Sequence, residues 1–288
     1  RVQGHAQRRR LDRYAGEARP ITWLCRGTIP LGVPALIAAM GGLGKSYLAL
    51  DLALQIAAGV AGLEQPRKIL GGRIAVEGTA VIVTAEDSFD AVHRRLNRID
   101  PTSRRLRHPR RFIVLPLPDA GGPRPLIATN GKALARTPFF EDIKRQLAVF
   151  ADLRLVVIDP LQAFALADVN ADPAAAQFLW SAMAELAAAT GATILLTHHM
   201  RKDGMLRIAD GDDAREAIRG TTALVDGSRL SYALWKLDDE TARPISWRVR
   251  ISRMRAARRS WFSRTARVIC AKASATSPIS SPVSRRMG

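Results

Sequence analysis

Residues 39–46 read Ala-Met-Gly-Gly-Leu-Gly-Lys-Ser and lie between an apolar run at 33–38 and an apolar helical pattern at 47–58. A strand, a glycine-rich loop and a helix in this order are typical of a phosphate-binding P-loop. The three glycines lack a Cβ, so the backbone can curl and point successive N–H groups at phosphate oxygens. This stretch therefore predicts that the chain binds a nucleoside triphosphate.

The loop residues have separate expected tasks. Lys45 can reach the β and γ phosphates, and Ser46 can place its hydroxyl on Mg²⁺, so ATP and Mg²⁺ are the expected cofactors. Ala39 stands where the motif usually begins with glycine, and alanine is the smallest substitute. The alternative is a glycine-rich turn in which Lys45 is merely solvated. The predicted nucleotide-binding residues are Ala39, Met40, Gly41, Gly42, Leu43, Gly44, Lys45, Ser46 and Tyr47.

Composition favours one substantial core and no membrane partner. The chain has 288 residues and 47% hydrophobic content, and it has no apolar stretch long enough to cross a bilayer. Cys25 and Cys270 lie far apart and match no metal or disulfide spacing. The arginine-rich beginning of the chain lacks the apolar segment of a signal peptide. We therefore expect a cytoplasmic location.

The formal net charge of +18 is concentrated at the two ends. Residues 1–20 carry six Arg against two acids, and residues 248–288 carry eleven Lys and Arg against none. Such tails can bind phosphate backbones, but they could equally be disordered extensions or residues read in the wrong frame. We expect a basic tail at 1–20, an ATPase domain at 21–250 and a disordered Ser- and Ala-rich tail at 251–288.

Apolar segments rich in β-branched residues alternate with helical patterns between residues 33 and 251. This alternation predicts an α/β fold with a mainly parallel central sheet flanked by helices. A terminal antiparallel hairpin is expected from 228–237 and 245–251. The other predicted strands are 33–40, 80–85, 112–115, 153–158 and 192–197, and the predicted helices are 46–58, 88–99, 139–150 and 173–189.

Two acids follow predicted strands, where ligands gather in parallel sheets. Asp159 ends an apolar run and is placed to hold Mg²⁺, unless it only opens the loop before Pro160. Glu86 could orient or deprotonate the water that attacks the γ-phosphate. Alternatively, Glu86 and Asp87 only cap the next helix.

Basic residues follow the strand at 192–197. His198 and His199 could contact the γ-phosphate and report its loss, or they could be structural. The loop from 200 to 216 is expected to be mobile and polar. Arg219 could reach the γ-phosphate of a neighbouring subunit, with a solvated arginine as the alternative.

The sequences AMGGLGKS, VIVTAED, LVVIDP, LLTHHMRK and IRGTTALVD occur in this order. With them the chain resembles the RecA-like hexameric replicative helicases, and among these the RepA-type plasmid replication helicases, over about residues 21–237. The resemblance implies a RecA-type core, a ring of six subunits and ATP at the subunit interfaces. It also implies roles for single residues: triphosphate and Mg²⁺ binding by Lys45 and Ser46, a catalytic carboxylate at Glu86, the metal-binding acid at Asp159, a sensor at His198 and His199, an arginine finger at Arg219, and a DNA-facing segment containing Arg201, Lys202 and Arg207.

The first functional hypothesis is an ATP-driven motor that moves along or unwinds DNA. The second is a nucleotide-switched DNA-binding or loader protein that hardly turns over, and the third is a degraded or mispredicted gene product. Aromatic residues make up only 6% of the chain, so contacts to single-stranded DNA should be mainly to phosphates. A replication initiator or a primase stays open as a further partner.

Overall fold

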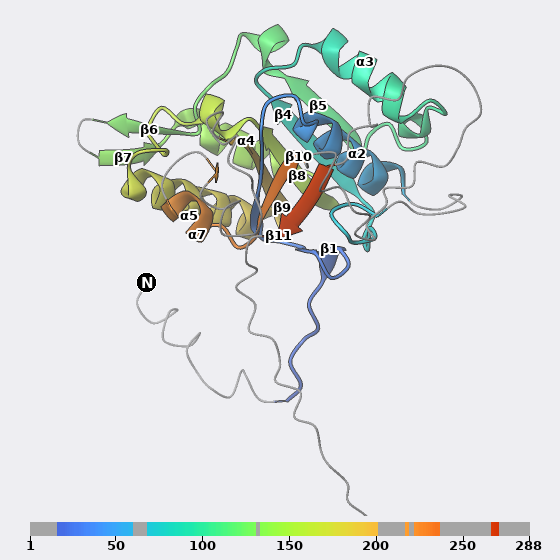
Figure 1. Ribbon diagram of the computed structural model, residues 1–288, viewed down its shortest axis with the longest axis horizontal. Helices are drawn as coiled ribbons and strands as arrows, with labels where there is room; N and C mark the ends of the chain where they lie inside the picture. The colour runs from blue at the N-terminus through green and yellow to red at the C-terminus, as the bar shows by residue number, and fades with distance from the viewer. Residues whose placement is uncertain are drawn as a thin grey trace, which may run out of the picture.

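The centre of the fold is a seven-stranded sheet with the strand order β11-β10-β3-β9-β8-β4-β5 (Figure 1). The computed structural model describes residues 16–59, 68–130, 133–200, 217–218, 222–236 and 266–270. Neighbouring strands are parallel except for the edge pair β10 and β11. The strands are β3 (Pro34–Ala39), β4 (Thr79–Thr84), β5 (Phe112–Pro116), β8 (Leu153–Asp159), β9 (Thr193–His199), β10 (Ser231–Lys236) and β11 (Ala266–Cys270).

Helices cover both faces of this sheet. One face packs against α2 (Lys45–Ala58) and α3 (Phe89–Ile99). The other packs against α4 (Pro138–Leu147), α5 (Pro173–Thr190) and the short α7 (Thr222–Asp226). Because both faces are buried, the central strands read as nearly continuous apolar runs rather than alternating ones. Short turns of 3-10 helix also occur, at η3 (Arg104–Leu106), η4 (Leu117–Ala120) and η5 (Leu161–Phe164).

Successive residues of each strand point to opposite faces. In β3, Leu36 and Ala38 belong to the core cluster beneath α4 and α5, whereas Ile37 and Ala39 belong to the cluster beneath α2. The same alternation determines which polar residues at the strand ends lie together on the face covered by α2.

Side-chain caps explain where three helices begin. The Ser88 hydroxyl accepts a hydrogen bond from the N–H of Ala91 at the start of α3. Thr137 and Asp172 cap α4 and α5 in the same way, and a proline follows each of them in the first turn. Proline suits this position because its missing N–H would have no partner within the helix.

Two small hairpins lie beside the main sheet. β1 (Trp23–Cys25) pairs with β2 (Ile29–Pro30), and β6 (Ile127–Asn130) pairs with β7 (Ala133–Arg136). Cys25 is buried, and burial raises the pKa of its thiol to about 12, so the thiol stays protonated at neutral pH.

The Arg136 side chain anchors the second hairpin. Its guanidinium lies 5.6 Å from the ring centroids of both Phe140 and Phe178, and it bonds to Glu185 on α5. A hydrogen bond from Lys144 lowers the pKa of Glu185 and raises that of Lys144.

The predicted parallel sheet, its five strands and its four long helices are confirmed. The sequence does not predict the hairpins β1–β2 and β6–β7, because their strands are too short to show a clear pattern. Among the described residues, no helix is both long and apolar enough to span a membrane.

The expected antiparallel pairing of the last strands is present, and the structure shows a partner strand that was not predicted. β10 lies within the predicted 228–237, but its antiparallel partner is β11, with Tyr232 opposite Cys270 and Lys236 opposite Ala266. The expected second strand at 245–251 lies outside the described residues. β11 falls in the segment 251–288 that was expected to be disordered. The sequence of this segment contains the β-branched pair Val268-Ile269, which favours a strand. The charge-rich composition around the pair outweighed this local signal.

Phe140 provides a test of the core beneath α4. Its side chain is fully buried, so Phe140→Ala should lower the free energy of unfolding by about 3–5 kcal/mol. Phe89, which is 63% exposed, is the matched control. Phe89→Ala should change the free energy of unfolding by less than about 0.5 kcal/mol. Urea denaturation followed by circular dichroism measures both, and equal losses would contradict this description of the core.

Candidate nucleotide-binding site

The P-loop lies at the carboxyl end of β3, between that strand and α2. Gly42 and Gly44 have φ angles of 78° and 87°, in the left-handed region that glycine enters without strain. No side chain caps the N-terminus of α2, and its first turn contains no acid. A Cβ built on Gly41 or Gly42 would meet no atom within 4 Å. An uncapped helix end beside open space fits an anion such as a triphosphate.

The predicted phosphate-binding lysine lies next to one of the predicted sensor histidines. Lys45 is only 8% exposed, and its Nζ lies 3.4 Å from Nδ1 of His199. Nε2 of the same imidazole lies 3.5 Å from Oε1 of Glu86. With a proton on Nε2, the ring would accept from Lys45 at Nδ1 and donate to Glu86. Three residues from distant parts of the chain thus form one connected row beside the P-loop.

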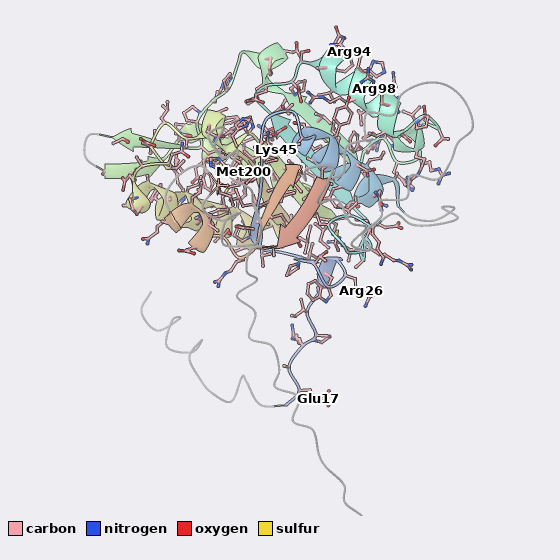
Figure 2. The ribbon with its side chains drawn as sticks, in the orientation of Figure 1. Glu17, Arg26, Lys45, Arg94, Arg98 and Met200 are labelled. Atoms are coloured by element: carbon pink, nitrogen blue, oxygen red, sulfur yellow. The ribbon has the colours of Figure 1, made fainter. Side chains whose placement is uncertain are left out.

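The register of the sheet brings this row together. β9 lies beside β3 with His199 opposite Ala39, the last residue before the loop. The backbone N–H of Met200 donates to the carbonyl of Ala39 at 3.0 Å. Figure 2 shows Lys45 and Met200 close together near the middle of the molecule.

The two histidines occupy different environments. His198 is fully buried, and its Nδ1 lies 2.7 Å from Nε2 of Gln162. Because side chains alternate along a strand, His198 points to the face covered by α5, away from His199. The structure therefore brings His199, and not His198, to Lys45 and Glu86.

A small cavity lies below the P-loop on the α2 face. Its polar lining comes from Ser46, Thr84, Asp87 and Asp159. Asp159 is 3% exposed, and the Thr197 hydroxyl donates a hydrogen bond to its Oδ1. Carboxylates and hydroxyls are hard oxygen donors of the kind that Mg²⁺ prefers. The two residues predicted as metal ligands, Ser46 and Asp159, thus lie together and fit this ion.

Among the described residues, no group of three or more His, Cys, Asp and Glu side chains could hold a metal ion by itself. Mg²⁺ usually binds one or two carboxylates together with phosphates and water.

Asp87 and Arg95 were not singled out as site residues in the sequence. Arg95 bonds to the Asp87 carboxylate, and its guanidinium lies 5.5 Å from the centroid of the Tyr47 ring. The Tyr47 hydroxyl accepts a hydrogen bond from Arg98 at 3.4 Å. The acid pair at 86 and 87 was a signal, but the sequence could not separate a helix cap from a site residue.

Several predicted residues lie outside the described part of the chain, namely Arg201, Lys202, Arg207 and Arg219. Arg201, Lys202 and Arg207 lie between the described residues Met200 and Ala217, and Arg219 follows the described Ile218. Met200 and Ile218 form an antiparallel bridge, so the segment between them begins and ends beside the carboxyl end of β9.

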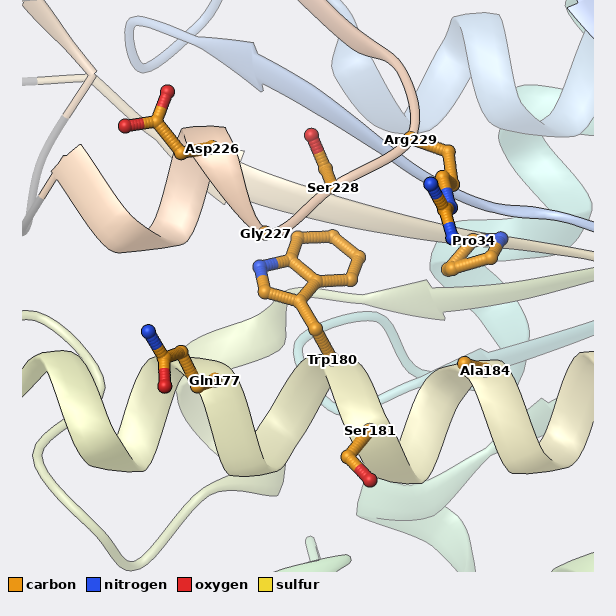
Figure 3. Close-up of a pocket in the computed structure, with 9 residues that line it drawn as sticks. All are labelled: Pro34, Gln177, Trp180, Ser181, Ala184, Asp226, Gly227, Ser228 and Arg229. Carbon is orange, nitrogen blue, oxygen red and sulfur yellow. The ribbon is translucent and has the colours of Figure 1, made fainter. Parts of the chain in front are cut away.

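A larger pocket of about 350 Å³ lies far from the P-loop, at the amino end of β3. Figure 3 shows Trp180 on α5 pointing toward Gly227, with Asp226 and Ser228 beside it. The Trp180 Nε1 donates to the carbonyl of Leu224 at 2.8 Å, and a Cβ on Gly227 would lie 2.3 Å from the Trp180 ring. These contacts dock α7 on α5.

Comparison with known proteins agrees with the fold and with the P-loop. The chain is similar to a solved structure of an ATPase domain, with a TM-score of 0.50 and 12% sequence identity. That match covers 82% of this chain and 81% of the other, and the shared feature is the RecA-like P-loop α/β fold. Residues 4–205 match the AAA domain family. The P-loop, the fold and this match over more than half of the chain together show that the protein belongs to the AAA domain family.

Proposed function

We propose that the protein is an ATP-hydrolysing motor that acts on DNA, and that within the RecA-like group it is a RepA-type replicative helicase. The observation that carries the proposal is the row Lys45, His199 and Glu86 beside the P-loop. In this row a phosphate-binding cation, a proton-bearing ring and an exposed carboxylate follow one another over two short contacts.

ATP and Mg²⁺ would occupy the space between the P-loop and the strand ends. The N–H groups at the start of α2 and the Lys45 ammonium would bind the phosphates. Ser46 and Asp159 would hold Mg²⁺, which when bound neutralises charge on the β and γ phosphates. The Thr197 hydroxyl fixes the orientation of the Asp159 carboxylate.

Glu86 is suited to position the attacking water. Its side chain is 54% exposed, so water reaches the carboxylate. The contact with His199 Nε2 orients this carboxylate. A triphosphate would compete with His199 for the Lys45 ammonium. Loss of the γ-phosphate would return Lys45 to His199, whose neighbour Met200 begins the predicted DNA-facing segment. This connection would link hydrolysis to movement of that segment.

The proposal includes a ring of six subunits around single-stranded DNA in the cytoplasm. Arg219 would act on the γ-phosphate of a neighbouring subunit, and Arg201, Lys202 and Arg207 would contact DNA phosphates. The bridge between Met200 and Ile218 supports this arrangement, because it brings both ends of the segment to the edge that carries the P-loop. A replication initiator or a primase would be a further partner.

The alternative function is a nucleotide-switched DNA-binding or loader ATPase with little or no unwinding. The engagement of Glu86 with His199 favours this alternative, because a held carboxylate would activate water slowly. Strand displacement separates the two functions. A motor opens a forked duplex with ATP, whereas a switch binds DNA with ATP and leaves the duplex intact.

Two substitutions test the row beside the P-loop. Lys45→Ala should abolish ATP binding, because Lys45 is the P-loop cation expected to bind the β and γ phosphates. Glu86→Gln should keep ATP binding and lower the turnover number about 10²- to 10⁴-fold, because the amide cannot take a proton. Steady-state ATP hydrolysis with and without single-stranded DNA, together with nucleotide-binding titrations, measures both effects.

Matched controls for these variants lie on the surface. Lys68→Ala and Glu141→Gln change the same residue types at exposed positions and should leave hydrolysis unchanged. Normal hydrolysis by Glu86→Gln would remove the catalytic role of Glu86. Normal ATP binding by Lys45→Ala would contradict the nucleotide site itself.

The finger at Arg219 is tested by mixing variants. Arg219→Ala should lower turnover about 10³-fold or more while ATP still binds. When it is mixed with Lys45→Ala, some interfaces pair an intact P-loop with an intact finger, so part of the activity should return. Arg215→Ala, in the same segment, is the control and should hydrolyse ATP normally. No recovery on mixing would argue against a finger that acts between subunits.

A further inference from the structure

We infer that Asp87 is a second acidic group of the Mg²⁺ site, and that Arg95 is its exchangeable counterion in the nucleotide-free protein. This inference rests on the proposed function, because it concerns the same nucleotide site. It assigns Asp87 a positioning role toward the hydration shell of the ion.

The backbone holds Asp87 close to the predicted metal-binding acid. Asp87 is 9% exposed and lines the same small cavity as Ser46 and Asp159. Its backbone N–H donates to the Thr84 hydroxyl at 3.3 Å. Thr84 lies opposite Asp159 in the β4–β8 register, and the N–H of Ala85 donates to the carbonyl of Asp159 at 2.8 Å. The segments that carry the two acids are therefore bonded to each other.

Two carboxylates at one small cavity repel each other unless each has a partner. Asp159 receives the Thr197 hydroxyl, which is neutral. Asp87 receives the Arg95 guanidinium, which is fully charged. The charge of Asp87 is thus compensated by the guanidinium of Arg95, beside a cavity whose polar lining also suits a metal cation.

The position of Arg95 allows its guanidinium to break and re-form the ion pair with Asp87. Its side chain is 27% exposed, whereas that of Asp87 is 12% exposed, so the pair is open to solvent from the arginine side. Its guanidinium also lies over the Tyr47 ring, which provides a second favourable contact from the residue after Ser46. When a divalent cation compensates Asp87, Arg95 can keep the Tyr47 contact alone.

A purely structural role for Asp87, as a cap of α3, does not explain its position at the cavity. The N-terminus of α3 is capped by Ser88, and Asp90 already supplies an acid to its first turn. The helix therefore does not need the Asp87 carboxylate for its start. Mg²⁺ retains several waters in most protein sites, so a nearby carboxylate can act by accepting hydrogen bonds from them.

The test is Mn²⁺ binding to the complex of the full chain with ADP, measured by electron paramagnetic resonance with the protein in excess over ADP, so that nearly all of the nucleotide is bound to protein. Asp87→Asn should weaken Mn²⁺ binding about 10-fold, the usual effect of losing an outer-shell partner of a metal. Asp90→Asn removes an exposed acid three residues away and should bind Mn²⁺ normally. Arg95→Met should tighten Mn²⁺ binding, because it removes the competing cation.

The opposite signs of the two variants separate this inference from a structural role. If the pair only stabilised the fold, Arg95→Met would weaken Mn²⁺ binding or leave it unchanged, and that result would overturn the inference. Unchanged binding by Asp87→Asn would also overturn it. If Asp87→Asn does not fold, as judged by circular dichroism, the Arg95→Met titration decides alone.

Asp159→Asn in the same titration distinguishes this inference from the proposed function. Weaker binding by Asp159→Asn with normal binding by Asp87→Asn would leave the proposed metal site intact and reject only the role of Asp87. Normal binding by both variants would reject the proposed Mg²⁺ site itself.

Discussion

The parallel pairing of β3 with β9 determines which side chains meet at the nucleotide site. It sets His199 opposite Ala39 and so brings an imidazole to Lys45, the lysine of the P-loop. A shift of the register by one residue would move His198 to that face and turn His199 toward α5. The buried hydrogen bond between His198 and Gln162 opposes such a shift, because it would be lost. Packing of the sheet and chemistry of the site are therefore set by the same register.

The alternation of side chains across the sheet also selects the polar residues of the cavity. Thr84, Asp159, Thr197 and His199 come from three strands and share the face covered by α2. On that face the hydroxyl of Thr197 meets Asp159, and the lysine at the start of α2 meets His199. The opposite face is packed mainly by apolar side chains beneath α4 and α5, with the hydrogen-bonded pair His198 and Gln162 at the end of β9. The groups expected to bind the nucleotide thus lie on one face of the sheet, and the larger apolar core lies on the other.

Charge compensation is the second feature of the site. The carboxylates of Glu86, Asp87 and Asp159 each have a partner from another segment: His199, Arg95 and Thr197 respectively. Buried or half-buried acids need such partners in the absence of a bound cation. Each partner is also a group that a nucleotide with its metal ion could replace or reorient. Each of these carboxylates consequently has a partner without ligand, and the site retains groups suited to binding one.

The sequence by itself determined the P-loop, five parallel strands and the helices between them, because these depend on local patterns: glycine spacing, apolar runs and helix caps. It also predicted Lys45, Ser46, Glu86 and Asp159 as site residues, because acids and P-loops at strand ends are local features. Only the tertiary structure decided that His199 rather than His198 contacts Lys45, and that Asp87 shares a cavity with Asp159 and bonds to Arg95. It also decided that β10 pairs with β11. These contacts join residues far apart in the chain, and they depend on strand order and register, which no local pattern specifies.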